Sequence, residues 1–281
     1  MAICLDGKAL AEKMRKEVRR EIEDLGIKPG LAVIIIGESP AARIYVESKK
    51  KDCAAYGLES AEFNLPEDTS EDTLLSLIAE LNERPDIHGI LIQLPLPEGF
   101  CKEKIINAIS PEKDVDAFHP ANIGRVMTGD YNFIPCTPAG VMELLAHYEI
   151  GLTGQHVVMV GCSNIVGKPQ ALLMLNENAT VTVCHAFTRD LGSQTRQADI
   201  LVVAVGHRGL ITKDMVKPGA IVVDIGISRG EDGKIYGDVD FPEVEPIASY
   251  ITPVPGGVGP MTRAILMRNT LTAAKRLSGL K

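Results

Sequence analysis

The chain has 281 residues, of which 45% are hydrophobic and 23% charged, and it carries a formal net charge of −8. This composition is typical of a globular protein with two domains, and the acidic balance argues against nucleic-acid or anionic-membrane partners. The six cysteines form no CxxC pair, the histidines form no HExxH motif, and no apolar run approaches ~20 residues. We therefore expect a cytoplasmic protein with reduced thiols, no metal site and no membrane span.

The first half of the chain alternates between predicted helices and strands. Apolar residues recur at helical spacing between Asp6 and Gly26, and the apolar run 31–36 predicts a strand buried on both faces. Further helices are expected over 41–56 and 70–82, with strands over 61–65 and 87–93. This alternation predicts a parallel α/β sheet that binds its ligand at the carboxyl ends of the strands.

Tyr45 and Lys49 stand four residues apart in the helix predicted after the first long strand. The spacing puts a ring and an ammonium on one helix face, where they could cover a planar ligand and deliver a proton. Spacing alone favours the simpler alternative, in which Tyr45 anchors the core and Lys49 belongs to a solvated lysine run.

Two polar residues follow at the expected ligand edge. Gln93 ends the apolar strand 87–93, where it could face either a ligand or water. Asp114 and Asp116 alternate on an extended segment, so only one of them can point into a cleft. The Asp116 carboxylate could accept paired N–H donors from a heterocycle. Thr137 is expected to cap a helix whose first residue is Pro138.

The second half begins with a strand over 156–160, a turn from Gly161 to Gly167 and a helix. Such a turn aims helix N-terminal amides at a phosphate, but it matches neither GxGxxG nor a Walker loop, which excludes a P-loop NTPase. Strands over 180–184, 200–205 and 220–225 complete a Rossmann-like nucleotide domain. His185 could contact a ribose there or be a surface histidine.

The segment Ile251–Thr262 combines three prolines and three glycines and carries no charge. This composition predicts a rigid loop whose main chain can approach a ligand closely. The helix predicted over 263–280 would pack back on the first domain. We expect a catalytic domain over 1–137 plus 263–281 and a nucleotide-binding domain over 138–262, with the loop at a ligand cleft.

Taken together, these residues resemble the bifunctional methylenetetrahydrofolate dehydrogenase/methenyltetrahydrofolate cyclohydrolase family, over essentially the whole chain. Any one motif is weak, but the ordered set is specific. The motifs are Tyr45-Val46-Glu47-Ser48-Lys49, Gln93-Leu94-Pro95-Leu96-Pro97, Lys113-Asp114-Val115-Asp116, His119-Pro120-Ala121-Asn122, Pro135-Cys136-Thr137-Pro138, the turn from Gly161 to Gly167, and Pro255 to Thr262.

The resemblance implies NADP-dependent oxidation of 5,10-methylenetetrahydrofolate, then hydrolysis of the methenyl product to 10-formyltetrahydrofolate in one-carbon metabolism and purine biosynthesis. It implies that Lys49 handles protons, Gln93 positions it, Tyr45 packs on the folate and Asp116 holds the pterin. It also implies a homodimer. The further substrate-binding residues it implies are Leu94, Pro255, Gly256, Gly257, Val258 and Gly259. The implied cofactor-binding residues are Gly161, Cys162, Ser163, Val166, Gly167, His185, Arg189 and Ile227.

Four positions depart from the family pattern. Ala42 and Ala117 replace a serine and a glycine near the folate residues, while Cys162 and Ala186 replace an arginine and a serine in the cofactor domain. The last two leave NAD as a possible cofactor, with Arg189 as a substitute cation for NADP. A shikimate-type NADP dehydrogenase and a non-catalytic nucleotide sensor are the alternatives.

Overall fold

The computed structural model describes residues 1–37 and 49–280. The chain forms two compact units. The Lys49 unit comprises Lys13–Arg125, Tyr131–Cys136 and Arg263–Lys281, and the Gly161 unit comprises Met1–Glu12, Val126–Asp130 and Thr137–Thr262. The division groups the first twelve residues with the Gly161 unit, although they are remote from it in sequence.

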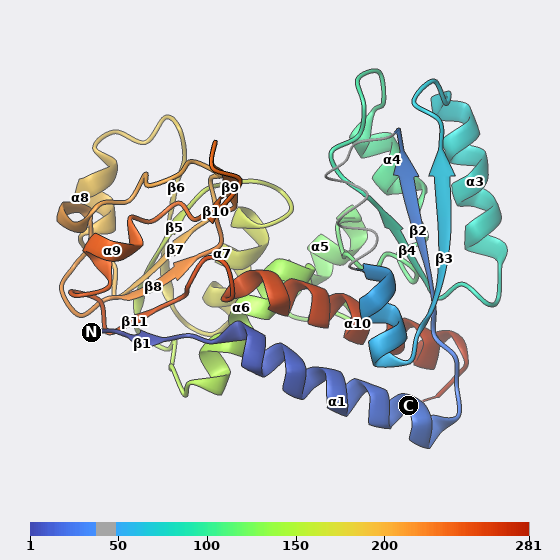
Figure 1. The fold of residues 1–281 in the computed structure, drawn as a ribbon, viewed down its shortest axis with the longest axis horizontal. Helices are drawn as coiled ribbons and strands as arrows, with labels where there is room; N and C mark the ends of the chain where they lie inside the picture. Colours follow the sequence, from blue (N-terminus) through green and yellow to red (C-terminus); the bar gives the residue numbers. More distant parts are fainter. Residues whose placement is uncertain (38–48, 281) are drawn as a thin grey trace. The chain divides into compact units, whose positions relative to one another are not determined.

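The Lys49 unit is built on a parallel sheet in the order β3-β2-β4 (Figure 1). These strands are β2 (Gly30–Ile36), β3 (Glu59–Leu65) and β4 (Gly89–Ile92). β2 lies in the centre, and its residues Leu31 to Ile35 are buried, as expected for an apolar, β-branched strand covered on both faces. The register sets Ile34 opposite both Phe63 and Ile92.

Helices complete this unit. Residues 49–56 are helical, followed by α3 (Glu71–Glu83), α4 (Lys102–Ala108) and α5 (Pro120–Thr128). Ser70 caps α3 by accepting a hydrogen bond from the Thr73 amide at 3.1 Å. Leu74, Ile78 and Leu81 of α3 are buried in one cluster with β2 and β4. This packing fixes the strands whose carboxyl ends carry polar residues.

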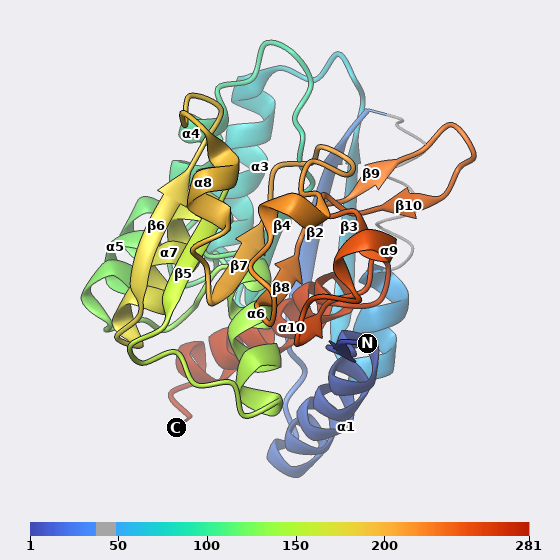
Figure 2. The ribbon, with the colours of Figure 1, turned by 90° about the vertical axis from the view of Figure 1, so that its left-hand side faces the viewer.

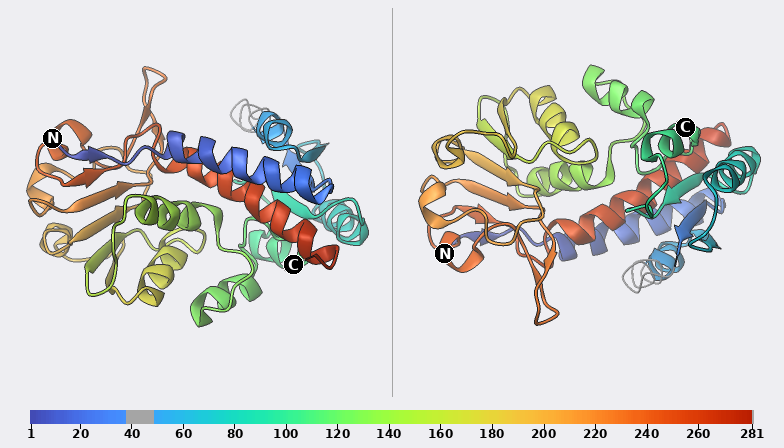
Figure 3. Two further views of the ribbon diagram at one scale, coloured as in Figure 1. Left: turned by 90° about the horizontal axis from the view of Figure 1, so that it is seen from below. Right: turned by 90° about the horizontal axis from the view of Figure 1, so that it is seen from above.

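Two long helices run side by side within this unit, as Figure 3 shows. They are α1 (Gly7–Leu25) and α10 (Val258–Leu277). The part of α1 from Lys13 onwards and the part of α10 from Arg263 onwards belong to this unit. An ion pair joins Lys275 Nζ of α10 to Glu21 Oε1 of α1 at 2.7 Å. The predicted return of the C-terminal helix to the first domain is therefore confirmed.

The Gly161 unit contains a six-stranded parallel sheet in the order β1-β11-β8-β7-β5-β6, part of which Figure 2 shows. Its strands are β1 (Ile3–Cys4), β5 (His156–Val160), β6 (Thr180–Cys184), β7 (Ile200–Val203), β8 (Ile221–Asp224) and β11 (Tyr250–Ile251). The connecting helices are α6 (Cys136–His147), α7 (Gly167–Asn176), α8 (Leu191–Thr195), the 3₁₀ turn Lys213–Met215 and α9 (Phe241–Val244). A hairpin of β9 (Ser228–Arg229) and β10 (Ile235–Tyr236) extends from it. The α/β prediction with a Rossmann-like second domain is confirmed.

The sequence misplaced the Pro/Gly segment in part. Tyr250–Ile251 forms strand β11 and α10 already begins at Val258, so the irregular part is only 252–257. α6 likewise begins at Cys136, which places Thr137 inside the first turn and not at its cap. Thr137 Oγ1 instead forms a 3.0 Å hydrogen bond with Thr262 Oγ1. Among the described residues, no helix is both long and apolar enough to cross a membrane.

Candidate functional site

A hydrogen-bonded pair of side chains lies at the carboxyl edge of the three-stranded sheet. Gln93 directly follows β4, and its amide N–H donates to Ile34 O at 2.9 Å, which extends the sheet by one residue. Its side-chain Nε2 donates to Leu94 O at 2.8 Å. This bond turns Oε1 towards Lys49, whose Nζ donates to it at 3.0 Å. The structure thus brings together two residues that are 44 positions apart.

Burial lowers the pKa of Lys49 below that of a free lysine. The negative charge of Asp116 acts in the opposite direction, followed by smaller contributions from Cys136 and Cys53. A lysine with a lowered pKa holds more of the neutral amine near neutral pH, and the neutral amine can accept a proton. Lys49 is therefore suited to general acid–base chemistry, and the solvated-lysine alternative is not supported for this residue.

Asp116 is the carboxyl group whose negative charge raises the pKa of Lys49. Burial raises the pKa of Asp116 to about 6, and the nearby Lys49 limits this rise while Asp114 adds to it. Asp116, Leu94 and Phe118 share the lining of a small, mostly apolar cavity of about 20 Å³, which is room for a single water molecule. A carboxyl group in such surroundings can bind N–H donors of a planar heterocycle strongly.

Asp114 lines the same cavity as Asp116, and its carboxylate also holds the turn that carries Asp116. Its carboxylate accepts hydrogen bonds from the amides of Phe118 at 3.2 Å and His119 at 2.8 Å, and from Asn122 Nδ2 at 2.8 Å. Ala117, which follows Asp116, has φ +58°, in the left-handed region that favours glycine. Both aspartates line the same small cavity, so the expectation that only one of them points into a cleft is not confirmed.

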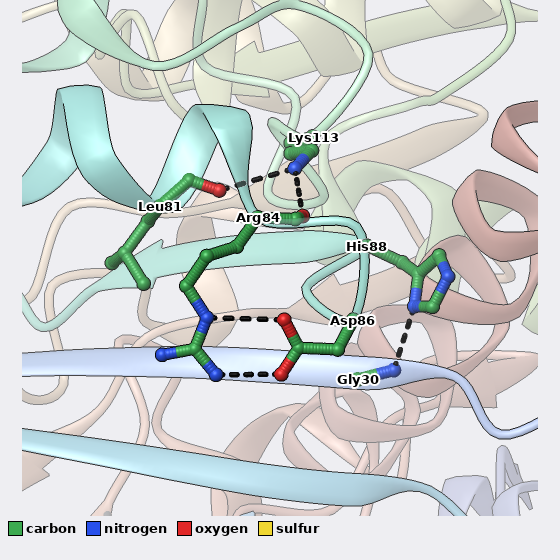
Figure 4. A network of polar contacts seen from close by, with 6 residues as sticks. All are labelled: Gly30, Leu81, Arg84, Asp86, His88 and Lys113. Atoms are coloured by element: carbon green, nitrogen blue, oxygen red, sulfur yellow. Dashed lines mark hydrogen bonds and ion pairs between the residues drawn. The ribbon is translucent and has the colours of Figure 1, made fainter.

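Lys113 directly precedes Asp114, and Figure 4 shows its hydrogen bonds to Leu81 and Arg84. Its buried Nζ donates to the carbonyl oxygens of Leu81 at 3.1 Å and Arg84 at 2.7 Å, at the end of α3. A cation here satisfies carbonyl groups that a helix end leaves unpaired and complements its dipole. Lys113 is thus structural, although it belongs to the same sequence motif as Asp116.

Sequence reasoning missed Asn269, which joins three backbone segments around Asp116. Its Nδ2 in α10 donates to Val115 O at 2.8 Å and Ile134 O at 3.1 Å, and lies 3.7 Å from Cys136 Sγ. Burial and the charge of Asp116 raise the pKa of the Cys136 thiol, so this cysteine stays protonated. No local pattern marks Asn269, because its partners are far away in sequence.

The Gly161 unit has an open cleft of about 540 Å³ at the carboxyl ends of its central strands. A side chain at Gly161 would collide with Ala204 O, and one at Gly167 with Gly161 O, so only glycine permits this close turn. Ser163 Oγ accepts hydrogen bonds from the amides of Val166 at 3.2 Å and Gly167 at 3.4 Å, at the start of α7. The lining residues are Val160, Gly161, Cys162, Ser163, His185, Ala186, Thr188, Leu191, Ala204, Val205, His207 and Leu210.

The remaining predicted residues are placed as follows. Arg189 and Ile227 are exposed and lie outside the set that lines this cleft. The peptide bond between Val254 and Pro255 is cis, and Gly256 has φ +117°. The Gly257 amide donates to Pro253 O at 2.8 Å, and Val258 and Gly259 begin α10. Tyr45 and Ala42 lie outside the described residues.

Comparison with known proteins gives matches along nearly the whole chain. The family model described as the catalytic domain of tetrahydrofolate dehydrogenase/cyclohydrolase matches residues 5–116. The model described as the NAD(P)-binding domain of the same family matches residues 135–278. The bifunctional protein FolD of Ruminiclostridium cellulolyticum is 54% identical over 279 residues, or 98% of each chain.

Solved structures agree with these matches. The bifunctional enzyme FolD, a methylenetetrahydrofolate dehydrogenase/cyclohydrolase from Campylobacter jejuni, is 51% identical with a TM-score of 0.96, covering 98% of this chain and 99% of that one. The methylenetetrahydrofolate dehydrogenase-cyclohydrolase of Trypanosoma brucei, solved with NADP and an inhibitor, is 39% identical with a TM-score of 0.94, covering 98% of both chains.

Proposed function

Since the chain belongs to the tetrahydrofolate dehydrogenase/cyclohydrolase family, we propose that it oxidises 5,10-methylenetetrahydrofolate with NADP and hydrolyses the methenyl product to 10-formyltetrahydrofolate. The observation that carries this proposal is the half-buried, hydrogen-bonded Lys49–Gln93 pair, whose lysine interacts with the charge of Asp116. A shikimate-type dehydrogenase is not favoured, because both family models name the folate reaction. A sensor without activity has no need of a lysine with a lowered pKa.

The hydrolytic step assigns a proton transfer to Lys49. Water attacks the methenyl carbon as the neutral Lys49 amine accepts its proton, and a C–O bond forms. The bond from that carbon to N5 then breaks as the proton returns from Lys49 to N5, and the remaining hydroxyl proton is released to water as the C=O bond forms, which leaves the formyl group on N10. Gln93 holds Nζ in place throughout through its 3.0 Å hydrogen bond, because an aligned base is far more effective than a free one.

The other folate-binding roles follow the chemistry of the side chains. Asp116 would accept N–H donors of the pterin through its two oxygens, and Leu94 would contact the same end of the substrate. Tyr45 would pack on the folate ring. The hydrogen bond from the Gly257 amide to Pro253 O fixes the turn that precedes α10, and we propose that residues 255–259 border the substrate.

The cleft of the Gly161 unit fits a dinucleotide. The bare backbone at Gly161 and Gly167 and the first amides of α7 would hold the phosphates, with Cys162, Ser163 and His185 of the cleft lining beside them. Val166, which is outside that lining, would contribute through its place in the turn before α7. NADP bound there would supply the acceptor for the hydride of the methylene carbon. We propose NADP as the preferred form, since no carboxylate is among the described residues that line the cleft and Arg189 would meet a 2′-phosphate; Ile227 would lie near the cofactor. NAD would be the weaker acceptor.

We further propose that residues 1–137 with 263–281 serve folate chemistry and 138–262 serve the cofactor, in a cytoplasmic homodimer that supplies purine biosynthesis. All six cysteines are free thiols, and the charge of −8 gives no support for nucleic-acid or membrane partners. Light scattering of the purified protein tests the homodimer, which a monomeric mass would contradict.

An absorbance assay tests the enzymatic proposal. Methylenetetrahydrofolate is supplied with NADP or with NAD, and reduced nucleotide and methenyl chromophore are followed separately. We expect rapid reduction of NADP, slower reduction of NAD, and decay of methenyltetrahydrofolate supplied alone. Failure to reduce either nucleotide would overturn the dehydrogenase assignment, and a methenyl decay equal to the buffer rate would overturn the cyclohydrolase assignment.

A further inference from the structure

A buried carboxylate in the Gly161 unit binds the backbone that lines the cofactor cleft. Asp238 is fully buried. Its Oδ2 accepts hydrogen bonds from the amides of Val205 at 2.6 Å and Gly206 at 3.0 Å, and its Oδ1 accepts one from His207 at 2.7 Å. Val205 and His207 line the cleft. Three consecutive amides after β7 are therefore fixed by one side chain that does not itself line the cleft.

Asp238 is held in turn by a second buried carboxylate, Asp224, at the end of β8. Asp224 Oδ1 accepts from the amides of Gly226 at 2.9 Å and Asp238 at 3.0 Å, and its Oδ2 accepts from Val239 at 2.9 Å. The Asp224 backbone is fixed by Thr252, whose Oγ1 accepts from the Asp224 amide at 2.7 Å and donates to its carbonyl at 3.2 Å. Thr252 opens the irregular Pro/Gly segment.

Two glycines leave the space that these carboxylates occupy. A side chain at Gly226 would collide with the carboxylate of Asp238, and one at Gly237 would collide with that of Asp224. Burying a charged carboxylate is costly unless hydrogen bonds compensate. Here every carboxylate oxygen has at least one backbone donor. The protein thus keeps two buried carboxylates whose hydrogen bonds lead to Val205 and His207, and these two residues line the cofactor cleft.

We propose that Asp238 is a positioning residue for the nucleotide: it holds residues 205–207 in the form that binds NADP, and Asp224 and Thr252 support it. This inference rests on the proposed function, because it takes the cleft as the NADP site. Charge-assisted hydrogen bonds to three amides hold residues 205–207 in one conformation before the nucleotide binds. The free-energy cost of ordering this loop on binding is therefore smaller.

The substitution Asp238→Asn tests this role with almost no change in shape. An amide offers one acceptor oxygen, so its NH2 group faces at least one backbone N–H, and the loop must shift. We expect the Kd for NADP, measured by calorimetry, to rise at least about tenfold, because the loop loses a matched hydrogen bond in the form that binds the nucleotide. Hydrolysis of methenyltetrahydrofolate without nucleotide should stay within about twofold of wild type.

The matched control is Asp240→Asn, two residues on, where the side chain makes no capping hydrogen bond; it should leave both measurements unchanged. An unchanged Kd for NADP in the Asp238→Asn variant would overturn the positioning role. An equal loss of nucleotide binding and hydrolysis would also overturn it, because that pattern indicates general loss of structure. Lack of NADP reduction by the wild type would instead refute the proposed function.

Hydrogen exchange of the wild-type protein provides a second test that needs no variant. Without nucleotide, the amides of Val205, Gly206 and His207 should exchange slowly, although residues 205–207 belong to no helix or strand. Exchange as fast as that of exposed loop amides, before NADP is added, would show that Asp238 does not preorganise this segment and would overturn the proposal.

Discussion

Lys49 Nζ donates a 3.0 Å hydrogen bond to Gln93 Oε1, and the second polar atom of that amide is occupied by Leu94 O. The amide therefore cannot rotate freely, and it presents a neutral acceptor to the lysine. A neutral partner matters because a charged one would stabilise the ammonium form and remove the base.

The variant Gln93→Glu should shift the pH dependence of hydrolysis. A carboxylate at this distance raises the pKa of Lys49, and each unit of increase lowers the neutral fraction about tenfold. We expect the rate of hydrolysis at pH 7 to fall at least about tenfold. The increase of this rate with pH should occur at a higher pH than in wild type. The control Gln155→Glu adds the same charge to a half-buried glutamine of the Gly161 unit, and its profile should match wild type. A coincident profile for Gln93→Glu would contradict the role of Lys49 as base.

Asp116 should make the stability of the protein depend on pH near 6. Its pKa is raised from 3.8 to about 6 in the folded protein, so the folded state binds this proton more tightly than the unfolded state. The contribution of Asp116 to stability is therefore most favourable below about pH 4 and is lost as the pH rises through 6.

Comparison of wild type with Asp116→Asn isolates this effect, because Asp224, whose pKa is also raised to about 6, is present in both. We expect the free energy of unfolding of wild type, relative to the variant, to improve by about 2 kcal/mol between pH 7.5 and pH 4.5. Urea titrations at both pH values measure it. A difference that does not change with pH, or changes in the opposite direction, would show that the Asp116 pKa is not raised.

Asn269→Leu should impair folate binding from a position that does not touch the substrate. The substitution removes the Asn269 donor from Val115 O and Ile134 O. Each buried carbonyl that loses its hydrogen bond lowers the free energy of unfolding by roughly 1–3 kcal/mol. Because Val115 precedes Asp116, we expect the KM for the folate to rise several-fold while the Kd for NADP stays constant. Thr272→Val, which removes a hydrogen bond to Arg268 O on the same helix, is the control. An unchanged KM for the folate would show that Asn269 does not support the position of Asp116.

The sequence predicted those features that depend on local patterns. The run Leu31 to Ile36 predicts β2 because uninterrupted apolar, β-branched residues suit a strand covered on both faces. The turn from Gly161 to Gly167 predicts a phosphate-binding strand–turn–helix because only glycine tolerates its close contacts. The two-residue strands β1 and β11 could not be predicted, because they exist through pairing of Ile3 with Tyr250, remote in sequence.

The site was predictable to a similar extent. Lys49, Gln93 and Asp116 were recognised by motif, but their mutual arrangement depends on the parallel pairing of β2 with β4. Asn269 and Asp238 gave no local signal. Asn269 acts on Val115 across 154 positions and Asp238 on Val205 across 33, so their importance appears only when the chain is folded.

The most direct test of the central claim separates the two reactions in a Lys49→Ala variant. Lys50→Ala and Lys51→Ala, which change exposed neighbours on the same helix, serve as controls. We predict that Lys49→Ala abolishes hydrolysis of supplied methenyltetrahydrofolate while NADP reduction remains measurable, so that methenyl product accumulates; both controls should behave as wild type. Hydrolysis at the wild-type rate in Lys49→Ala would contradict the assignment of the proton transfer to Lys49.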